Sequence, residues 1–232
     1  ENQVIALAAN DGRQLWAYSG AAAPTILLGG AAPAVDGGVV VAALGTGELA
    51  ALRIDTGTPL WSENIVAVRR TEAAANLPDI AARPVIDRGR VYVVGQSGVL
   101  VAIDLRSGQR LWDVPVAGIY EPWIAGDFIF AVSIDSEAVC IDARSGQIIW
   151  VTQLPRYLNE EKRTNRIVWV GPVLASDRLI LVNSRNEAFS LSPYNGNVMG
   201  RIELDSSASF PPVFANSTMY LVDDGGDLIA YR

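Results

Sequence analysis

Three short parts of this sequence contain residues whose types could do chemistry. Gly45-Thr46-Gly47-Glu48 has two glycines spaced as in a dinucleotide-binding loop, where backbone N–H groups approach phosphate oxygens. The acidic run 223–227 (DDGGD) supplies carboxylate oxygens, which are the ligands that calcium prefers. Cys140 is the single cysteine, and a thiolate can act as a nucleophile or a metal ligand. Histidine, the commonest general base and zinc ligand, does not occur in the chain.

None of the three features is expected to form a catalytic or metal site. The glycines at 45–47 align with Gln96-Ser97-Gly98 of a later repeat, and no helix is predicted to follow them, so a turn is favoured. The acidic run takes the same place between two strands and lacks the further ligand spacing of an EF-hand. Cys140 stands in a column of small strand residues, which favours burial over redox chemistry. We therefore predict no catalytic residue, no metal and no cofactor.

The sequence contains an internal repeat that accounts for the positions of these turns. Five segments superimpose without gaps, each with a small residue at its third position and a glycine near its end. They are 4–16 (VIALAANDGRQLW), 49–61 (LAALRIDTGTPLW), 100–112 (LVAIDLRSGQRLW), 138–150 (AVCIDARSGQIIW) and 188–200 (AFSLSPYNGNVMG), and 228–232 begins a sixth. The distance between successive segments varies, which predicts one repeated unit with connections of different length.

A tryptophan ends four of the five segments, four residues beyond the glycine. The four are Trp16, Trp61, Trp112 and Trp150, and Gly200 takes this place in the fifth segment. A large indole at one position per repeat is typical of a side chain that docks one unit onto the next. We therefore expect these tryptophans to be largely buried at boundaries between units.

The aspartates that precede the turn glycines predict turns rather than catalysis. Asp104 and Asp142 each stand four residues before a glycine. An aspartate can accept hydrogen bonds from the backbone ahead of it, and glycine adopts positive φ without strain.

Upstream of each segment lies a short strand, often with a proline, then a tight turn and a β-rich run such as Val39-Val40-Val41. Each unit is thus predicted to have four strands over about 40–50 residues, the length of a propeller blade. The predicted fold is an all-β propeller of four-stranded antiparallel blades, one domain over residues 1–232. The expected blades are 1–19 (partial), 31–67, 82–117, 121–155, 170–204 and 210–232 (partial).

Composition excludes several classes of protein. Half of the 232 residues are hydrophobic and 19% are charged, and no 18-residue apolar run occurs, which excludes disorder and a membrane-spanning helix. The net charge of −7 and the pI near 4.6 disfavour a nucleic-acid partner, because such a surface repels phosphates.

The blade signature, Ala-x-Asp-x-x-Ser/Thr-Gly-x-x-x-Trp, resembles the propellers named after pyrroloquinoline-quinone enzymes. Within that group, Thr71 to Gln109 and the closing run 227–232 (DLIAYR) are most similar to the BamB family, lipoprotein subunits of the bacterial outer-membrane β-barrel assembly (BAM) machinery. The resemblance covers essentially the whole chain. It implies an eight-bladed ring at the periplasmic face of the outer membrane, with a lipid-bearing cysteine on a preceding part. Bound quinone is not expected, since a lone Cys140 excludes the vicinal cysteine pair found beside that cofactor.

The resemblance also implies partners and a binding surface. BamB-like proteins bind the barrel subunit BamA through two neighbouring connections between blades, and act with other assembly-complex subunits and nascent outer-membrane proteins. By position, the BamA-binding residues correspond here to Leu27 and Asp79, with their neighbours Leu28 and Ile80. The family's arginine is replaced by Leu28 and its second aspartate by Ala81. The other long connection, 154–170, carries a charge run at 159–166 for which solvation is the favoured interpretation.

The leading hypothesis is a non-catalytic scaffold of the BAM complex. The alternatives are a propeller enzyme or a quinone- or sugar-binding domain with its chemistry in other blades, and a periplasmic adaptor with a different partner. Because residue 1 falls within a blade, we expect the chain to be a fragment. Its open flanks would then be covered by the preceding piece, by a second copy through self-association, or by strand 14–18 pairing with 228–231.

Overall fold

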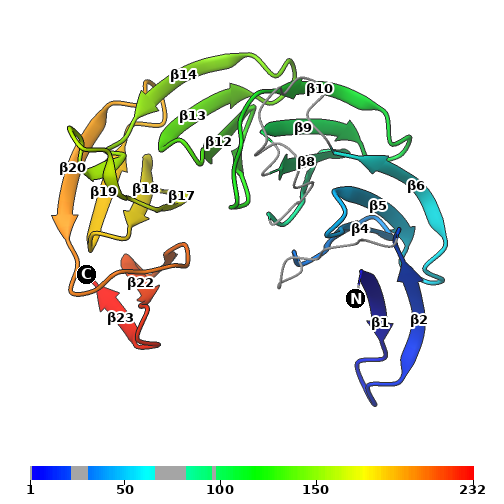
Figure 1. Cartoon of the computed structure of the whole chain (residues 1–232). Helices are drawn as coiled ribbons and strands as arrows, with labels where there is room; N and C mark the ends of the chain where they lie inside the picture. The colour runs from blue at the N-terminus through cyan, green and yellow to red at the C-terminus, as the bar shows by residue number, and fades with distance from the viewer. Residues whose placement is uncertain (1, 22–30, 66–81, 96–97) are drawn as a thin grey trace. The chain divides into compact units, whose positions relative to one another are not determined.

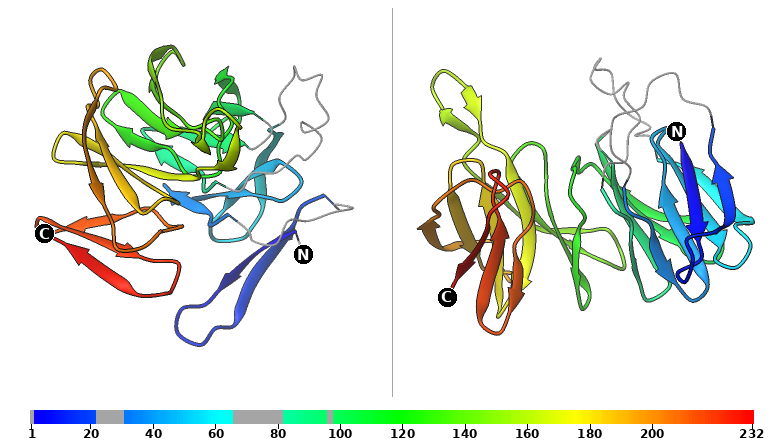
Figure 2. Two further views of the ribbon diagram at one scale, coloured as in Figure 1. Left: turned by 60° about the vertical axis from the view of Figure 1, so that its left-hand side comes forward. Right: turned by 90° about the horizontal axis from the view of Figure 1, so that it is seen from below.

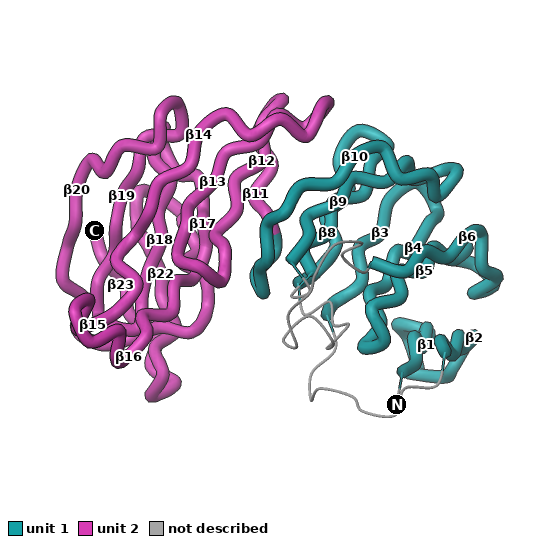
Figure 3. The backbone as a smooth tube through the Cα atoms, turned by 45° about the horizontal axis from the view of Figure 1, so that its top comes forward, with its two compact units in different colours: residues 1–121 teal, residues 122–232 magenta. Residues whose placement is uncertain are grey.

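The computed structural model describes residues 2–21, 31–65, 82–95 and 98–232, and the regular elements in these ranges are all β-strands (Figure 1). The chain divides into two compact units, residues 1–121 and 122–232 (Figure 3). Within the described ranges, no helix is long and apolar enough to cross a membrane. The prediction of an all-β chain is confirmed.

In its described residues, the first unit contains one two-stranded sheet and two four-stranded sheets. The two-stranded sheet pairs β1 (Gln3–Leu7) with β2 (Gln14–Ser19). The next sheet consists of β3 (Ala34–Asp36), β4 (Val39–Ala43), β5 (Glu48–Arg53) and β6 (Pro59–Asn64). The last consists of β7 (Val85–Asp87), β8 (Arg90–Gly95), β9 (Val99–Asp104) and β10 (Arg110–Val114).

The second unit repeats this arrangement and adds a hairpin. One blade consists of β11 (Trp123–Ala125), β12 (Phe128–Val132), β13 (Glu137–Asp142) and β14 (Ile148–Gln153). The hairpin pairs β15 (Tyr157–Asn159) with β16 (Thr164–Arg166). The next blade consists of β17 (Trp169–Ala175), β18 (Arg178–Asn183), β19 (Glu187–Leu191) and β20 (Val198–Glu203). A three-stranded sheet of β21 (Val213–Ala215), β22 (Thr218–Val222) and β23 (Leu228–Tyr231) follows.

Every four-stranded sheet has its strands in chain order, each antiparallel to the next. The middle strands are buried along nearly their whole length, whereas the outer strand alternates between half-buried and exposed residues. The apolar run Val39-Val40-Val41 suits a middle strand, because a strand that is buried on both faces needs an apolar side chain on each face. In the first unit the core lies between two blades, where Val41 and Leu49 pack with Val91 and Val101.

The register of the third and fourth strands matches the columns of the sequence repeat. Each tryptophan of the series lies opposite the small residue of its own segment, and Gly200 does the same. The pairs are Ala6↔Trp16, Ala51↔Trp61, Ala102↔Trp112, Cys140↔Trp150 and Ser190↔Gly200. The residue opposite each tryptophan is small, so it leaves space beside the indole ring at the boundary with the neighbouring blade.

Three of the tryptophans contact the following blade in the same way. Trp16 Nε1 donates to the carbonyl of Ile54 at 2.9 Å, Trp61 Nε1 to Leu105 at 2.8 Å and Trp150 Nε1 to Pro193 at 3.0 Å. Each accepting carbonyl belongs to the turn between the third and fourth strands of the next blade. The three indoles are partly buried at these junctions. Trp112 is also half-buried, and its ring lies 5.9 Å from that of Tyr92 in its own blade.

Candidate functional site

The four residues to which the resemblance assigned partner binding lie outside the described residues. Leu27 and Leu28 belong to the segment 22–30, and Asp79 and Ile80 to the segment 66–81. In the sequence, the first segment connects β2 to β3 and the second connects β6 to β7. Their assignment remains a prediction, and the structure describes only where these connections begin and end.

The strand order determines which end of a blade these connections leave. In a sheet of four antiparallel strands in chain order, the turn between the second and third strands lies at the same end as the exit of the fourth strand. We call this the connection end of each blade. Its turns are 44–47, 133–136, 184–186 and 223–227. Loops at one end of a rigid scaffold are where binding residues concentrate.

At the connection end of β3–β6, Glu48 holds the beginning of the first long connection. Its carboxylate accepts from the hydroxyl of Tyr18 at 2.9 Å and from the backbone N–H of Ala21 at 3.1 Å. Asn2 extends the contact by donating to the carbonyl of Ala21 and accepting from the N–H of Gly45. Partial burial and the bond to Glu48 raise the pKa of the Tyr18 hydroxyl, so this group stays protonated as a donor.

The second long connection also has a fixed beginning. The N–H of Ile65 donates to the carbonyl of Gly47 at 2.8 Å, and the Ile65 side chain is buried. Arg110 donates to the Glu63 carboxylate at 3.0 Å and to the Asn64 carbonyl at 3.2 Å. At the far side of the connection, Ala82 is buried. Both segments that carry predicted partner residues therefore adjoin backbone that is fixed by hydrogen bonds or burial.

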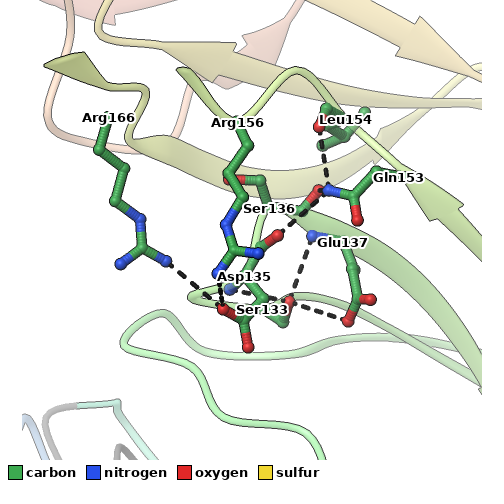
Figure 4. Close-up of polar contacts among 8 residues, drawn as sticks. All are labelled: Ser133, Asp135, Ser136, Glu137, Gln153, Leu154, Arg156 and Arg166. Atoms are coloured by element: carbon green, nitrogen blue, oxygen red, sulfur yellow. Dashed lines mark hydrogen bonds and ion pairs between the residues drawn. The ribbon is translucent and has the colours of Figure 1, made fainter. Parts of the chain in front are cut away.

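In the second unit, the connection end carries a polar cluster around Asp135 (Figure 4). Arg156 and Arg166 both point toward the Asp135 carboxylate, and the Arg166 guanidinium lies 3.7 Å from it. Gln153 donates to the carbonyls of Asp135, Ser136 and Leu154 at 3.0–3.1 Å. These bonds join the β12–β13 turn to the end of β14 and to the hairpin β15–β16.

The hairpin β15–β16 is ordered by its own contacts as well. Glu160 accepts from the backbone N–H groups of Arg156 and Tyr157 at 3.0 and 3.1 Å, and these bonds lower the pKa of its carboxyl. At the base, Trp169 Nε1 donates to the carbonyl of Pro155 at 2.8 Å, and its buried ring packs edge-on against Phe189. The hairpin extends beyond the end of β17–β20 (Figure 2). Residues 157–166 therefore project from the blade on a hairpin that hydrogen bonds hold in place.

Sequence reasoning missed this hairpin. The residues 159–166 are exposed, as expected for a solvated run, but they form the end of β15, the turn and β16 rather than an unstructured loop. The pairs Tyr157-Leu158 and Ile167-Val168 on either side of a polar stretch were the signal that could have indicated two short strands.

The other chemistry-bearing residues have structural surroundings. Burial raises the pKa of the Cys140 thiol to about 12, which leaves it protonated and unreactive near neutral pH. Asp104 and Asp142 each accept from a serine hydroxyl at 2.8 Å and from backbone N–H groups of their turns. In the acidic run, Asp223 accepts from Ser206 at 2.7 Å and from the N–H of Gly225. In the part of the chain that the structure describes, no cluster of three or more His, Cys, Asp or Glu residues could hold a metal ion.

Comparison with known proteins gives a consistent result. The family model described as "Outer membrane protein assembly factor BamB" matches residues 1–152. The chain is 27% identical over 234 residues to the outer membrane protein assembly factor BamB of Burkholderia pseudomallei, covering 100% of this chain and 59% of that protein. It is 34% identical over 109 residues to the protein of the same name from Vibrio cholerae, covering 47% of this chain and 28% of the relative.

Solved structures share the fold. The crystal structure of BamB from Moraxella catarrhalis matches with a TM-score of 0.83 at 19% identity, covering 99% of this chain and 66% of that one. The computationally designed Ika8 protein matches with a TM-score of 0.69 at 14% identity, covering 100% and 68%. The predicted β-propeller fold is confirmed. The chain spans about 59% of the length of the Burkholderia relative.

Proposed function

This chain belongs to the family of outer-membrane protein assembly factors called BamB, and from that premise we propose that it is a non-catalytic scaffold subunit of the BAM complex. In this proposal it binds BamA and assists the folding and insertion of outer-membrane proteins at the periplasmic face of the outer membrane. The observation that carries the proposal is the family match over residues 1–152, which includes both connections with predicted partner residues.

The surroundings of these connections support a binding role. Glu48 and Asn2 fix the beginning of the first connection, and the Ile65–Gly47 bond fixes the beginning of the second. A loop whose ends are held loses less conformational entropy when it binds than a loop on free ends. The hydrogen-bonded states of Asp104, Asp142 and Asp223 favour structural roles for these carboxylates over catalysis.

The proposal is tested by co-purification of BamA with the full-length protein from detergent-solubilised envelopes. Leu27→Glu and Asp79→Arg should each reduce the amount of BamA recovered, while the melting temperature stays within about 2 °C of wild type, as for most surface changes. Asp36→Arg is the matched control, because Asp36 is exposed at the opposite end of its blade. It should leave BamA recovery unchanged.

Two results would contradict the proposal at different levels. Full recovery of BamA by both variants would show that BamA binds through other residues. Absence of BamA from the wild-type eluate, together with a retained small molecule in the native mass spectrum, would favour a cofactor-binding propeller instead.

A further inference from the structure

The junction between the blade β17–β20 and the sheet β21–β23 differs from the other junctions within each unit. The tryptophan position of this blade is Gly200, which lies opposite Ser190 in the register that pairs Trp150 with Cys140. A Cβ atom at Gly200 would meet only the Ser190 hydroxyl, at 3.2 Å, among atoms within 4 Å. The backbone here does not need glycine, since Gly200 is not in the left-handed region. The absence of a side chain at Gly200 therefore leaves space beside β20.

This space is part of a cavity of about 530 Å³ beside Gly200. Its apolar walls come from both sheets and comprise Ile180, Phe189, Ile202, Phe214 and Met219. Phe189 and Met219 are buried, whereas Ile202 is half exposed. A cavity of this size, with apolar walls and a few polar groups, is typical of small-molecule sites.

The charged side chains that line the cavity are arginines. Arg178, Arg201 and Arg232 line it, and no aspartate or glutamate does, although the chain carries a net charge of −7. The Arg201 guanidinium donates to Glu187 at 2.9 Å and lies 5.9 Å from the centre of the Phe189 ring. The side chain of Arg178 is exposed and has no hydrogen-bond or ion-pair partner among the described residues, whereas its backbone belongs to the β17–β18 ladder. Its guanidinium is therefore available to an anion.

We propose that this cavity binds a small planar aromatic carboxylate. The ring lies beside Gly200, between the apolar walls and against Met219, whose thioether packs well against aromatic rings. The carboxylate pairs with the guanidinium of Arg178, which presents two parallel donors to such a group. At the other junctions the outer strand supplies the aromatic group and the next blade supplies a glycine. Here the outer strand supplies the glycine and the ligand supplies the aromatic group.

The test is calorimetric titration of the 232-residue chain with indole-3-acetate as the probe, in parallel with indole and with acetate. Indole-3-acetate should bind with one site per chain. Indole should bind about tenfold more weakly, since it lacks the charged partner of Arg178, and acetate should give no measurable binding.

Variants locate the site. Gly200→Trp should abolish binding of indole-3-acetate and raise the melting temperature, because the new side chain fills the cavity. Met199→Trp is the matched control: it adds the same side chain to the same strand at an exposed residue that alternation turns to the opposite face. It should bind the probe as wild type does. Arg178→Gln should weaken indole-3-acetate about tenfold and leave indole unchanged.

Two results would overturn the inference. The first is the absence of saturable binding of indole-3-acetate by the wild-type chain. The second is equal binding by wild type and by a folded Gly200→Trp variant, which would place the probe elsewhere. Should Gly200→Trp fail to fold, Arg178→Gln decides, because equal losses for indole and indole-3-acetate would exclude the carboxylate contact. None of these outcomes depends on BamA, so the inference and the proposed function fail separately.

Discussion

The indole of Trp61 occupies the space that a side chain at Gly108 would need. A Cβ atom at Gly108 would lie 2.6 Å from Cγ of Trp61, and Trp61 Nε1 donates to the Leu105 carbonyl of the same turn at 2.8 Å. One hydrogen bond and one close contact thus hold the indole on the turn of the next blade. Trp16 and Gly57, and Trp150 and Gly196, have the same relationship. Gly57, Gly108 and Gly196 therefore serve the junction between blades as well as their own turns.

Gly108→Ala should destabilise the protein by more than its backbone conformation explains. Gly108 has φ +73°, and Gly89 has φ +74° with no atom within 4 Å of a Cβ. Gly89→Ala should therefore cost only the left-handed strain, about 1 kcal/mol, whereas Gly108→Ala should cost about 1–3 kcal/mol more because of the clash with Trp61. Urea unfolding of both variants measures the difference. Equal losses would mean that the contact across the junction does not form.

Trp61→Ala should remove the extra cost of Gly108→Ala. The substitution alone should destabilise by about 3 kcal/mol, at the lower end of the usual range because the indole is half-buried. In the Trp61→Ala background, Gly108→Ala should then cost no more than Gly89→Ala does. A double-mutant cycle gives this coupling directly, with an expected size of about 1–3 kcal/mol. Additive losses would show that the two residues do not interact.

The repeat could be recognised in the sequence because each of its columns has a local structural role, in a turn or at a junction between blades. Asp104 and Gly108 suit the turn between the third and fourth strands, and a tryptophan stands four residues beyond the glycine in four of the segments. Together with the β-rich runs upstream, such as Val39-Val40-Val41, these columns predicted the strands of each blade. In the structure, Trp61 lies opposite Ala51. Trp61 lies on the less exposed face of the outer strand, which alternates between exposed and half-buried residues.

The parts that sequence reasoning did not find depend on contacts between distant residues. The hairpin β15–β16 is fixed by Asp135, which lies 21 residues before Arg156 on a different turn. The cavity beside Gly200 is closed by Phe214 and Met219 of the next sheet. Gly200 is an exception in the tryptophan column of the sequence, but only the structure shows that arginines line the cavity beside it.

Asp135→Asn should loosen the hairpin β15–β16 without unfolding the blade. The substitution removes the charge that Arg156 and Arg166 share, and exposed ion pairs contribute at most about 1 kcal/mol to global stability. The hydrogen bond from the Ile167 N–H to the Arg156 carbonyl closes the base of the hairpin, so that N–H should exchange with solvent faster. Amide hydrogen exchange measures this. Asp55→Asn, which removes an exposed ion pair with Arg53, is the control and should leave Ile167 unchanged.

Acid sensitivity should depend in part on Ser107 and Ser145. Their hydroxyls donate to Asp104 and Asp142 at 2.8 Å, and these bonds, with backbone N–H groups of the turns, hold the pKa of each carboxyl below its ordinary value of 3.8. Because the folded pKa is lower than the unfolded one, the stabilisation is complete above pH 3.8 and is lost as the pH falls through the folded value.

The double variant Ser107→Ala, Ser145→Ala should therefore be less stable than wild type at pH 6, and the difference should shrink as the pH is lowered through the acid range. Once both aspartates are protonated, the charged form that the hydroxyls favour is no longer present, so the two proteins should lose their difference. Urea unfolding midpoints from pH 6 to about pH 2.5 give the comparison, since this range passes through the ordinary carboxyl pKa of 3.8 and continues below it. Ser62→Ala, on an exposed residue of β6, is the control and should follow the wild-type pH profile. A difference between wild type and the double variant that stays constant with pH would show that the serines act by packing rather than through the carboxylates.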